Sequence, residues 1–399
     1  MGNRLQRRSP TIRDVAREAG VSVATISRVL NRREDVAVGT RERVLRVIRE
    51  QGYTRNSTAS ALSRGRSELV GVTLPEIKSS YFARLADAIV DALYEHDLRA
   101  VFCPTRHERE LELTLLERLM HGTTEGAVLI LPSESSVELL AVQGQGYPLV
   151  VLDPKTPVGP GIPSVSAANT AGAAAATQHL LGLGHRRIAA ITGPAGWCAT
   201  VDRLAGIHAA LAEAGIEPRA AFEAEADFEV AGGRAAAVRL LTLPDRPTAI
   251  VAFNDNLAIG ALQAARELGL ALPADLSVVG FDDSEQAPLV TPGLTTVRQP
   301  LGEMARMAVS LLTRLLADRP VEALKVELAT TLVVRESTAP PPARRRQATG
   351  EPLAPAATAT AASRRGVRGS GARRAASPSC DSNGRAAGAR ASDSESAGG

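Results

Sequence analysis

The sequence has few aromatic residues, few cysteines and no long apolar run. Aromatic side chains make up 3% of its 399 residues. The three cysteines, Cys103, Cys198 and Cys380, lie far apart and form neither a metal-binding spacing nor a disulfide framework, which is typical of a reducing compartment. No stretch of about 18 uninterrupted apolar residues is present, which argues against a membrane span. A polar helical pattern follows the basic N-terminus where a signal peptide would have its apolar core, so we expect a cytoplasmic protein.

The motifs of common enzyme classes are missing as well. No G-x-x-x-x-G-K-[ST] or G-x-G-x-x-G motif follows a predicted strand, and no G-x-S-x-G motif occurs. The six histidines show no metal-ligand spacing. We therefore expect no catalytic activity, no cofactor and no metal.

The small net charge of +3 hides a strong asymmetry along the chain. Residues 1–67 carry fifteen Arg or Lys and six Asp or Glu, a net charge of +9, whereas residues 68–337 have a net charge of −12. A basic module joined to an acidic body is typical of a polyanion-binding head, although an ordinary solvated basic face would carry the same charge.

Composition and periodicity divide the chain into five regions. Residues 1–10 form a short polar arm that we expect to be flexible, residues 11–56 have a tight helical pattern, and residues 57–68 are a small, polar linker. Residues 69–337 form the body. Residues 338–399 are rich in Ala, Arg, Ser, Gly and Pro and have almost no large apolar side chains, so we expect a disordered, low-complexity tail.

The body alternates short apolar runs with longer amphipathic stretches. The runs predict buried strands at 69–74, 99–103, 126–131, 148–153, 187–192, 249–253 and 277–281. The stretches between them predict helices at about 82–97, 108–121, 170–183, 202–214, 230–242, 256–268 and 301–317. This alternation indicates parallel sheets covered by helices, and so many strands predict two lobes with a cleft between them.

Residues 11–31 predict two short helices joined by a sharp turn. Thr11 and Asp14 have the spacing of a helix N-cap and an acidic residue in the first turn. Gly20 tolerates the positive φ of a turn, and Ser22 can cap the second helix. A third helix at about 40–51 packs against the pair. Its inward residues are expected to be Val44, Leu45, Val47 and Ile48. The module is therefore a predicted helix-turn-helix.

The second helix of such a motif enters the major groove of DNA. Val23 and Ala24 can contact thymine methyl groups, and Arg28 can donate two hydrogen bonds to guanine. Short hydroxyl side chains suited to phosphate contacts are Ser22, Thr25 and Ser27. The alternative is that these residues only cap helices and cover the surface of a three-helix domain.

These motifs resemble the lactose-repressor (LacI/GalR) family of bacterial transcription regulators. The matching pattern is T-I-R-D-V-A-x-x-A-G-V-S-x-A-T-I-S-R-V-L-N, followed by V-x-x-x-T-R-E-R-V and G-Y-x-x-N, and the resemblance covers about 11–337. It implies an N-terminal all-α helix-turn-helix head plus an α/β two-lobed periplasmic-binding-protein-like (type I) effector and dimerisation domain. In this family, Arg28 and the two residues after Ser22 read bases.

The linker matches the family pattern N-x-x-A-x-x-L at Asn56, Ala59 and Leu62. The resemblance implies a hinge helix that forms on operator DNA, with Leu62 inserted into the minor groove, where an apolar wedge kinks the duplex. A flexible linker with an incidental leucine is the alternative. The family usually has Pro where this chain has Arg55, which leaves the preceding loop less rigid.

Polar residues at strand ends are candidates for an effector site, because open α/β sheets bind ligands there. Asp153, Asn254 and Asp282 each follow a predicted strand, although Asp and Asn also form turns at such positions. Asp255 and Asp283 are expected to cap helices or hold the hinge. The resemblance adds an aromatic wall, an arginine that grips effector oxygens and a stacking aromatic, which correspond to Tyr81 and Phe82, Arg203 and Phe228.

One departure from the family lies beside this aromatic wall. Many members have Ser-Asn-Pro where this chain has Lys78-Ser79-Ser80. A lysine near the cleft favours an anionic effector such as a sugar phosphate, whereas a solvent-facing lysine carries no such meaning.

The sequence thus predicts a homodimeric, nucleoid-associated repressor that binds double-stranded operator DNA. Its effector is expected to be a sugar, a sugar phosphate or a nucleoside or purine. A binding protein that feeds a transporter would need an export signal. A nonspecific architectural DNA protein would show steep salt dependence without sequence preference.

Overall fold

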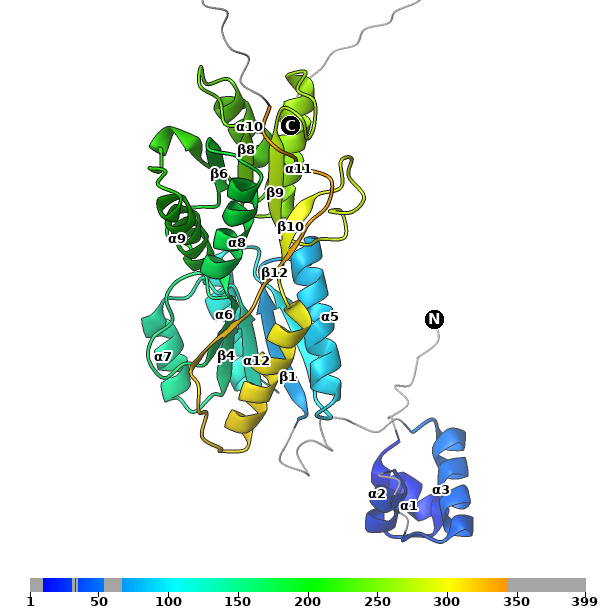
Figure 1. The fold of residues 1–399 in the computed structure, drawn as a ribbon. Helices are drawn as coiled ribbons and strands as arrows, with labels where there is room; N and C mark the ends of the chain where they lie inside the picture. Colours follow the sequence, from blue (N-terminus) through cyan, green and yellow to red (C-terminus); the bar gives the residue numbers. More distant parts are fainter. Residues whose placement is uncertain (1–9, 31–32, 34, 54–66, 123, 343–399) are drawn as a thin grey trace, which may run out of the picture. The chain divides into compact units, whose positions relative to one another are not determined.

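The computed structural model describes residues 10–30, 33, 35–53, 67–122 and 124–342. Residues 1–9 of the predicted arm, the hinge residues Asn56, Ala59 and Leu62, and nearly all of the predicted tail lie outside these ranges. The head contains three helices (Figure 1), which are α1 (Ile12–Ala19), α2 (Val23–Leu30) and α3 (Val38–Gln51).

Local chemistry sets the ends of the head helices. The Thr11 side chain accepts a hydrogen bond from the Asp14 amide at 3.3 Å, and the Asp14 carboxylate accepts one from the Thr11 amide at 3.0 Å, which completes a capping box. Gly20 ends α1 in the left-handed conformation with φ +63°. The Ser22 hydroxyl accepts from the Thr25 amide at 3.1 Å at the start of α2.

Small aliphatic side chains form the core of the head. The buried residues are Val15, Ala16, Ala19, Ile26, Val29, Val36, Val44 and Val47. The expectation that Leu45 also packs inward is wrong, because its side chain is 37% exposed. Adjacent helical residues point about 100° apart, so a helix that buries Val44 turns Leu45 toward solvent.

The first lobe of the body, here the N-terminal lobe, contains a six-stranded parallel sheet in the order β11-β5-β4-β3-β1-β2. Its strands are β1 (Leu69–Leu74), β2 (Arg99–Pro104), β3 (Gly126–Ile130), β4 (Leu149–Leu152), β5 (Ser164–Ala167) and β11 (Lys325–Leu328). Its helices are α5 (Ser80–Tyr94), α6 (Arg109–His121), α7 (Ser136–Gly144) and α12 (Leu301–Leu316). Alternate strand residues face opposite layers. Val128 and Ile130 belong to the core under α5 and α12, while Ala127 and Leu129 belong to the core under α6 and α7.

The C-terminal lobe repeats this layered design. Its sheet has the order β12-β10-β9-β8-β6-β7, in which only β12 runs antiparallel to its neighbour. Its strands are β6 (Ile188–Thr192), β7 (Glu223–Glu225), β8 (Ala249–Ala252), β9 (Ser277–Asp282), β10 (Thr295–Arg298) and β12 (Thr331–Val333). Its helices are α8 (Asn169–Gly182), α9 (Cys198–Glu213), α10 (Val230–Leu241), α11 (Asp255–Glu267) and the short 3-10 helix η1 (Ala220–Phe222).

Three short connections join the lobes. They run from β5 to α8, from β10 to α12 and from β11 to β12, and each contains only one or two residues between the elements. The carboxyl ends of the parallel strands in both lobes therefore meet at one cleft. Thr338 and Ala339 hydrogen-bond to His179 and His185, so the contacts of the C-terminal lobe continue past Ser337.

The predicted strands and helices of the body are all present, with ends that differ by a few residues. The sequence patterns missed α7 and the short strands β5, β7, β10, β11 and β12. These strands have three or four residues and include polar ones, so they lack the apolar run that indicates a buried strand. Within the described ranges, no helix is both long and apolar enough to span a bilayer.

Gly206 permits the close approach of α9 to α8. A Cβ at this position would lie 2.1 Å from the carbonyl oxygen of Thr170, and that backbone atom cannot move without shifting α8. We expect Gly206→Ala to lower the free energy of unfolding by about 1–3 kcal/mol, because overpacking forces the two helices apart. Gly182→Ala is the matched control, since nothing lies within 4 Å of its added Cβ. Urea denaturation of both variants measures the difference, and equal stability of the two would contradict the close packing.

Candidate functional site

A cavity of about 480 Å³ lies in the cleft between the lobes. The residues predicted from strand ends and from the family pattern all line it: Tyr81, Phe82, Asp153, Arg203, Phe228, Asn254 and Asp282. They come from both lobes and from six separate segments of the chain. Its size falls within the range of about 300–1,000 Å³ that is usual for small-molecule sites.

Arg203 is the most constrained of these residues. It lies on α9 and is only 4% exposed. Its Nε donates to Asn169 Oδ1 at 2.8 Å, and a terminal nitrogen donates to the Phe253 carbonyl oxygen. The guanidinium carbon lies 3.6 Å from the centroid of the Phe281 ring. The planar cation is therefore fixed in orientation, as oriented recognition of ligand oxygens requires.

Two carboxyl groups, that of the buried Asp153 and that of the half-buried Asp282, lie near Arg203. The Asp153 carboxylate accepts from Tyr81 Oη at 2.9 Å, and the Asp282 carboxylate accepts from Gln299 Nε2 at 2.7 Å. Burial raises the pKa of Asp153, and burial together with neighbouring carboxylates raises the pKa of Asp282 to about 8, although Arg203 opposes both shifts. Asp282 is therefore largely protonated at neutral pH and can donate as well as accept a hydrogen bond.

Sequence reasoning missed Trp197, the only tryptophan of the chain. It precedes α9 and lines the cavity beside Phe228, with 5.3 Å between the two ring centroids and an interplanar angle of 43°. The Lys155 ammonium lies 5.1 Å from the Trp197 centroid. A single tryptophan in the G-P-A-G-W loop after a buried strand was the available signal, since loops at strand ends line such clefts.

The structure gives Asn254 a structural role within the cleft wall. Its Oδ1 accepts from the Leu257 amide at 2.8 Å and so caps α11, and its Nδ2 donates to the Phe228 carbonyl at 3.1 Å. Asn256 Nδ2 donates to the same carbonyl at 3.2 Å. Both asparagines thus hold the backbone of Phe228 in place.

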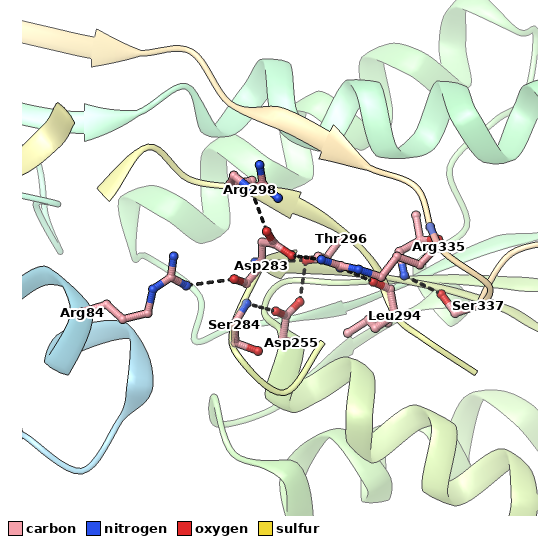
Figure 2. Close-up of polar contacts among 10 residues, drawn as sticks. Arg84, Asp255, Asp283, Ser284, Leu294, Thr296, Arg298, Arg335 and Ser337 are labelled. Carbon is pink, nitrogen blue, oxygen red and sulfur yellow. Dashed lines mark hydrogen bonds and ion pairs between the residues drawn. The ribbon is translucent and has the colours of Figure 1, made fainter. Parts of the chain in front are cut away.

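Asp255 and Asp283 hold the hinge side of the C-terminal lobe, as Figure 2 shows. The Asp255 carboxylate is buried and accepts from the Ser284 amide at 2.7 Å and from the Thr296 hydroxyl at 2.5 Å. The Asp283 carboxylate accepts from Arg298 at 2.7 Å and from Arg335 at 2.6 Å. Burial alone would raise the pKa of Asp283, but these two arginines lower it below its usual value.

The backbone of Asp283 also contacts the other lobe. Arg84, on α5 of the N-terminal lobe, donates to the Asp283 carbonyl oxygen at 2.8 Å (Figure 2). A second bond between the lobes joins the Cys198 amide to the Lys155 carbonyl at 2.9 Å. The two contacts lie next to cleft residues, Asp282 and Trp197 respectively, so a change in lobe spacing must alter the cleft.

Lys78 faces solvent rather than the interior of the cleft. Its side chain is 73% exposed and pairs with Glu76 at 3.2 Å and with Glu229 of the other lobe at 3.6 Å. These acidic partners raise its pKa. Its charge is therefore balanced by carboxylates at the mouth of the cavity.

The head presents the predicted base-reading side chains on one surface of α2. Val23 is 41% exposed, Ala24 is exposed, and the Arg28 side chain is 60% exposed, with a loose ion pair to Asp35 at 3.7 Å. Ser22 is exposed, and its Oγ lies 2.9 Å from Thr25 Oγ1. Thr25 and Ser27 are half-buried at the base of this surface.

A helix-turn-helix head and a two-lobed α/β domain with a polar cleft define a class of ligand-responsive regulators. Two family models match the chain: Bacterial regulatory proteins, lacI family, over residues 11–56, and Periplasmic binding protein-like domain, over residues 177–338. The chain belongs to the lacI family of bacterial regulatory proteins. The family resemblance and the fold class predicted from the sequence are thus confirmed.

The similar proteins are transcriptional regulators and not enzymes. The ribose operon repressor of Halalkalibacterium halodurans is 35% identical over 82% of this chain and 97% of that protein. The HTH-type transcriptional repressor PurR of Edwardsiella ictaluri is 33% identical over 83% and 98%. A lac repressor dimer bound to operator and the anti-inducer ONPF is 30% identical, with a TM-score of 0.75 over 83% of this chain and 100% of that one. A complex of the regulator CelR with cellobiose is 32% identical, with a TM-score of 0.63 over 82% and 99%.

The raised pKa of Asp282 predicts a pH-dependent stability. The folded protein holds this proton up to about pH 8, whereas an unfolded Asp loses it near 3.8, so this group costs stability progressively as pH rises between those values. Asp282→Asn imitates the protonated form. We therefore expect the difference between the melting temperatures of the variant and the parent protein to shift in favour of the variant as the pH is raised from 5 to 8. The exposed Glu117→Gln is the control, and a difference that stays constant with pH would refute the buried, protonated state.

Proposed function

We propose that the chain is a homodimeric transcriptional repressor whose affinity for operator DNA is controlled by a sugar-like effector in the cleft. One observation supports this proposal most directly: oriented hydrogen-bond donors and acceptors from both lobes meet in one buried site. They belong to Tyr81, Asp153, Arg203 and Asp282. Such groups suit a ligand with several hydroxyls. The relatives support this reading, because their names include a ribose operon repressor and a cellobiose complex.

In this proposal, two copies of the head read a palindromic operator. Arg28 on each α2 donates to a guanine, Val23 and Ala24 contact neighbouring bases, and the hydroxyl residues Ser22, Thr25 and Ser27 contact phosphates. The hinge residues Asn56, Ala59 and Leu62 then contact the minor groove at the centre. A lac repressor dimer bound to its operator supports the two-fold arrangement.

Control follows from ligand contacts in both lobes. An effector that touches Tyr81 and Asp153 in one lobe and Arg203 and Asp282 in the other stabilises one spacing of the lobes. The linker enters the N-terminal lobe directly at β1, so that spacing changes the position of the two linkers in a dimer. Only an effector with different affinity for the two arrangements can alter operator binding.

The DNA-reading role of Arg28 gives the test of this function. Binding sites are selected from random duplexes by the full-length protein, and affinities are compared between a selected and a scrambled duplex. We expect Arg28→Ala to reduce the discrimination between them by about 1–3 kcal/mol, because one bidentate base contact is lost while phosphate contacts remain.

Arg46→Ala is the control of equal charge, since Arg46 is an exposed residue of α3. It should weaken binding to both duplexes alike. Equal losses on the two duplexes for Arg28→Ala would show that Arg28 reads no base, and a parent protein without any preferred duplex would end the proposal.

The hydrogen bond between Arg84 and Asp283 predicts a second effect. Arg84→Ala removes one contact between the lobes, so the lobes should open more often by a factor of about 2–10, from a hydrogen bond worth about 0.5–1.5 kcal/mol. The Cys198 amide reports this opening because its bond partner is the Lys155 carbonyl of the other lobe. Hydrogen exchange at this amide should therefore accelerate. Arg99→Ala, which removes only an ion pair within the N-terminal lobe, should leave it unchanged. Unaltered exchange in Arg84→Ala would exclude a role in closure.

A further inference from the structure

The cleft has two ends with separate sets of charged groups. Burial is the largest cause of the raised pKa of Tyr81, and the charged groups that also act on it are Asp153, Asp282 and Arg203. Those that act on the pKa of His107 are Glu76, Lys155, Lys78 and Glu229. No residue belongs to both sets. Arg203 and Asp153 are 4% and 8% exposed, whereas the side chains of Lys78 and Glu229 are 73% and 57% exposed. The first set forms the deep end, and the second forms the mouth.

The rings of Trp197 and Phe228 form an aromatic platform on the wall of the same cavity. Both rings are only partly buried, and Lys155, a mouth residue, lies over Trp197. The Phe228 ring is fixed, because its carbonyl accepts from Asn254 and Asn256 and because its edge lies over Gly193, where a Cβ would come within 2.1 Å of the ring. Aromatic faces held rigidly in a polar cleft are suited to stacking against a ring of the ligand.

The charges of the cleft favour a neutral ligand. The deep end contains two carboxyl groups, and at the mouth Glu76 and Glu229 pair with Lys78. Burial also lowers the pKa of His107, so its ring is neutral at pH 7. Of the other two cations, Lys155 contacts the Ser133 hydroxyl at 3.4 Å and the Trp197 face, and Arg203 lies at the deep end beside Asp153. A phosphate group would meet no net positive field here.

The platform also has few groups that could read a nucleobase. Base edges are recognised by amide groups that donate and accept in the plane of the ring. The Nδ2 atoms of Asn254 and Asn256 are both directed at the Phe228 carbonyl. Two further amide side chains line the cavity, of which Gln299 already donates through its Nε2 to Asp282 at 2.7 Å, so Gln286 is the remaining amide. The other polar lining residues carry hydroxyl, carboxyl, imidazole or cationic groups, which bind hydroxyl groups well.

Building on the function proposed above, we propose that the cleft binds a neutral disaccharide, with one sugar ring at the deep end and the second ring stacked on Trp197 and Phe228. The hydroxyls of the first ring meet Asp153, Asp282 and Arg203, and those of the second ring meet Lys155 and Glu229. The cavity of about 480 Å³ is of a size that accepts ligands larger than a single sugar ring. Trp197 is then the residue that determines specificity for two rings over one.

The sole tryptophan makes this proposal directly measurable. Full-length protein is titrated with cellobiose, maltose, lactose, trehalose, sucrose and melibiose, with glucose, galactose and ribose, and with adenosine and hypoxanthine. Tryptophan fluorescence and calorimetry are recorded together. We expect at least one disaccharide to change the fluorescence and to bind at least about tenfold more tightly than either of its component sugars.

Variants at the platform separate the two subsites. Trp197→Ala should weaken the disaccharide by about tenfold or more and the matching monosaccharide by less than about threefold, as calorimetry measures, while Trp197→Phe keeps most of the affinity. Tyr94→Ala, an exposed aromatic on α5, is the control and should change neither. Equal losses for both sugars, or tighter binding of a monosaccharide, adenosine or hypoxanthine than of every disaccharide, would overturn the proposal.

The same compounds separate this inference from the proposed function. If a monosaccharide or nucleoside releases the protein from its selected duplex and no disaccharide does, the repressor function stands and the disaccharide is wrong. If no duplex is preferred but a disaccharide binds in a Trp197-dependent way, the ligand class stands and the repressor function is wrong.

Discussion

The cleft depends on the burial of one cation. Arg203 carries a charge that water cannot solvate, and an uncompensated buried ion costs several kcal/mol. Asn169, at the start of α8, and the Phe253 carbonyl accept two of its N–H bonds, and the Phe281 ring covers one face. Two carboxyl groups lie nearby, of which Asp153 supplies opposite charge. One of those carboxyl groups, Asp153, belongs to the other lobe. The site therefore already has the donor and acceptor directions that a polar ligand meets, which lowers the ordering cost of binding.

Two neighbouring residues, Asp282 and Asp283, line the cavity and contact the other lobe, respectively. Both residues have positive φ, at 113° and 49°, a region in which non-glycine residues cost about 1–3 kcal/mol each. Gln299, Arg298 and Arg335 hold the two carboxylates and so maintain this conformation. As a result, Asp282 faces the ligand cavity while the carbonyl of Asp283 accepts the hydrogen bond from Arg84. The proposed ligand contact at Asp282 and the lobe contact at Asp283 are one residue apart, which would be a direct physical route for coupling.

Sequence patterns located most of the cleft because parallel strands bring their carboxyl ends together. Asp153, Asn254 and Asp282 follow from that rule, and the family pattern added Arg203 and the aromatics. The same rule also covers the loop after β6 and would have found Trp197 there, but the prediction took only residues directly at strand ends. The rule could not find Arg84, whose importance depends on how the two lobes meet. It also could not assign roles: Asn254 lines the cavity, but both ends of its side chain are bonded to the protein. Short strands such as β12 were not predicted, because three residues are too few to show a periodicity. Leu45 was predicted to be buried because an apolar run does not show which of its residues faces solvent.

In the repressor proposed above, the coupling between cleft and DNA passes through a short stretch of chain. The linker leads into β1, and six residues after β1 the chain reaches Ser80 and Tyr81 at the start of α5. A linker held at a fixed spacing by operator DNA therefore biases the N-terminal lobe, just as a ligand held at Tyr81 and Asp153 biases the linker. Linkage requires the two effects to be equal in free energy, so operator DNA must change the affinity for the effector by the same factor as the effector changes the affinity for DNA. A compound that binds both lobe arrangements equally leaves operator binding unchanged, however tightly it fills the cavity.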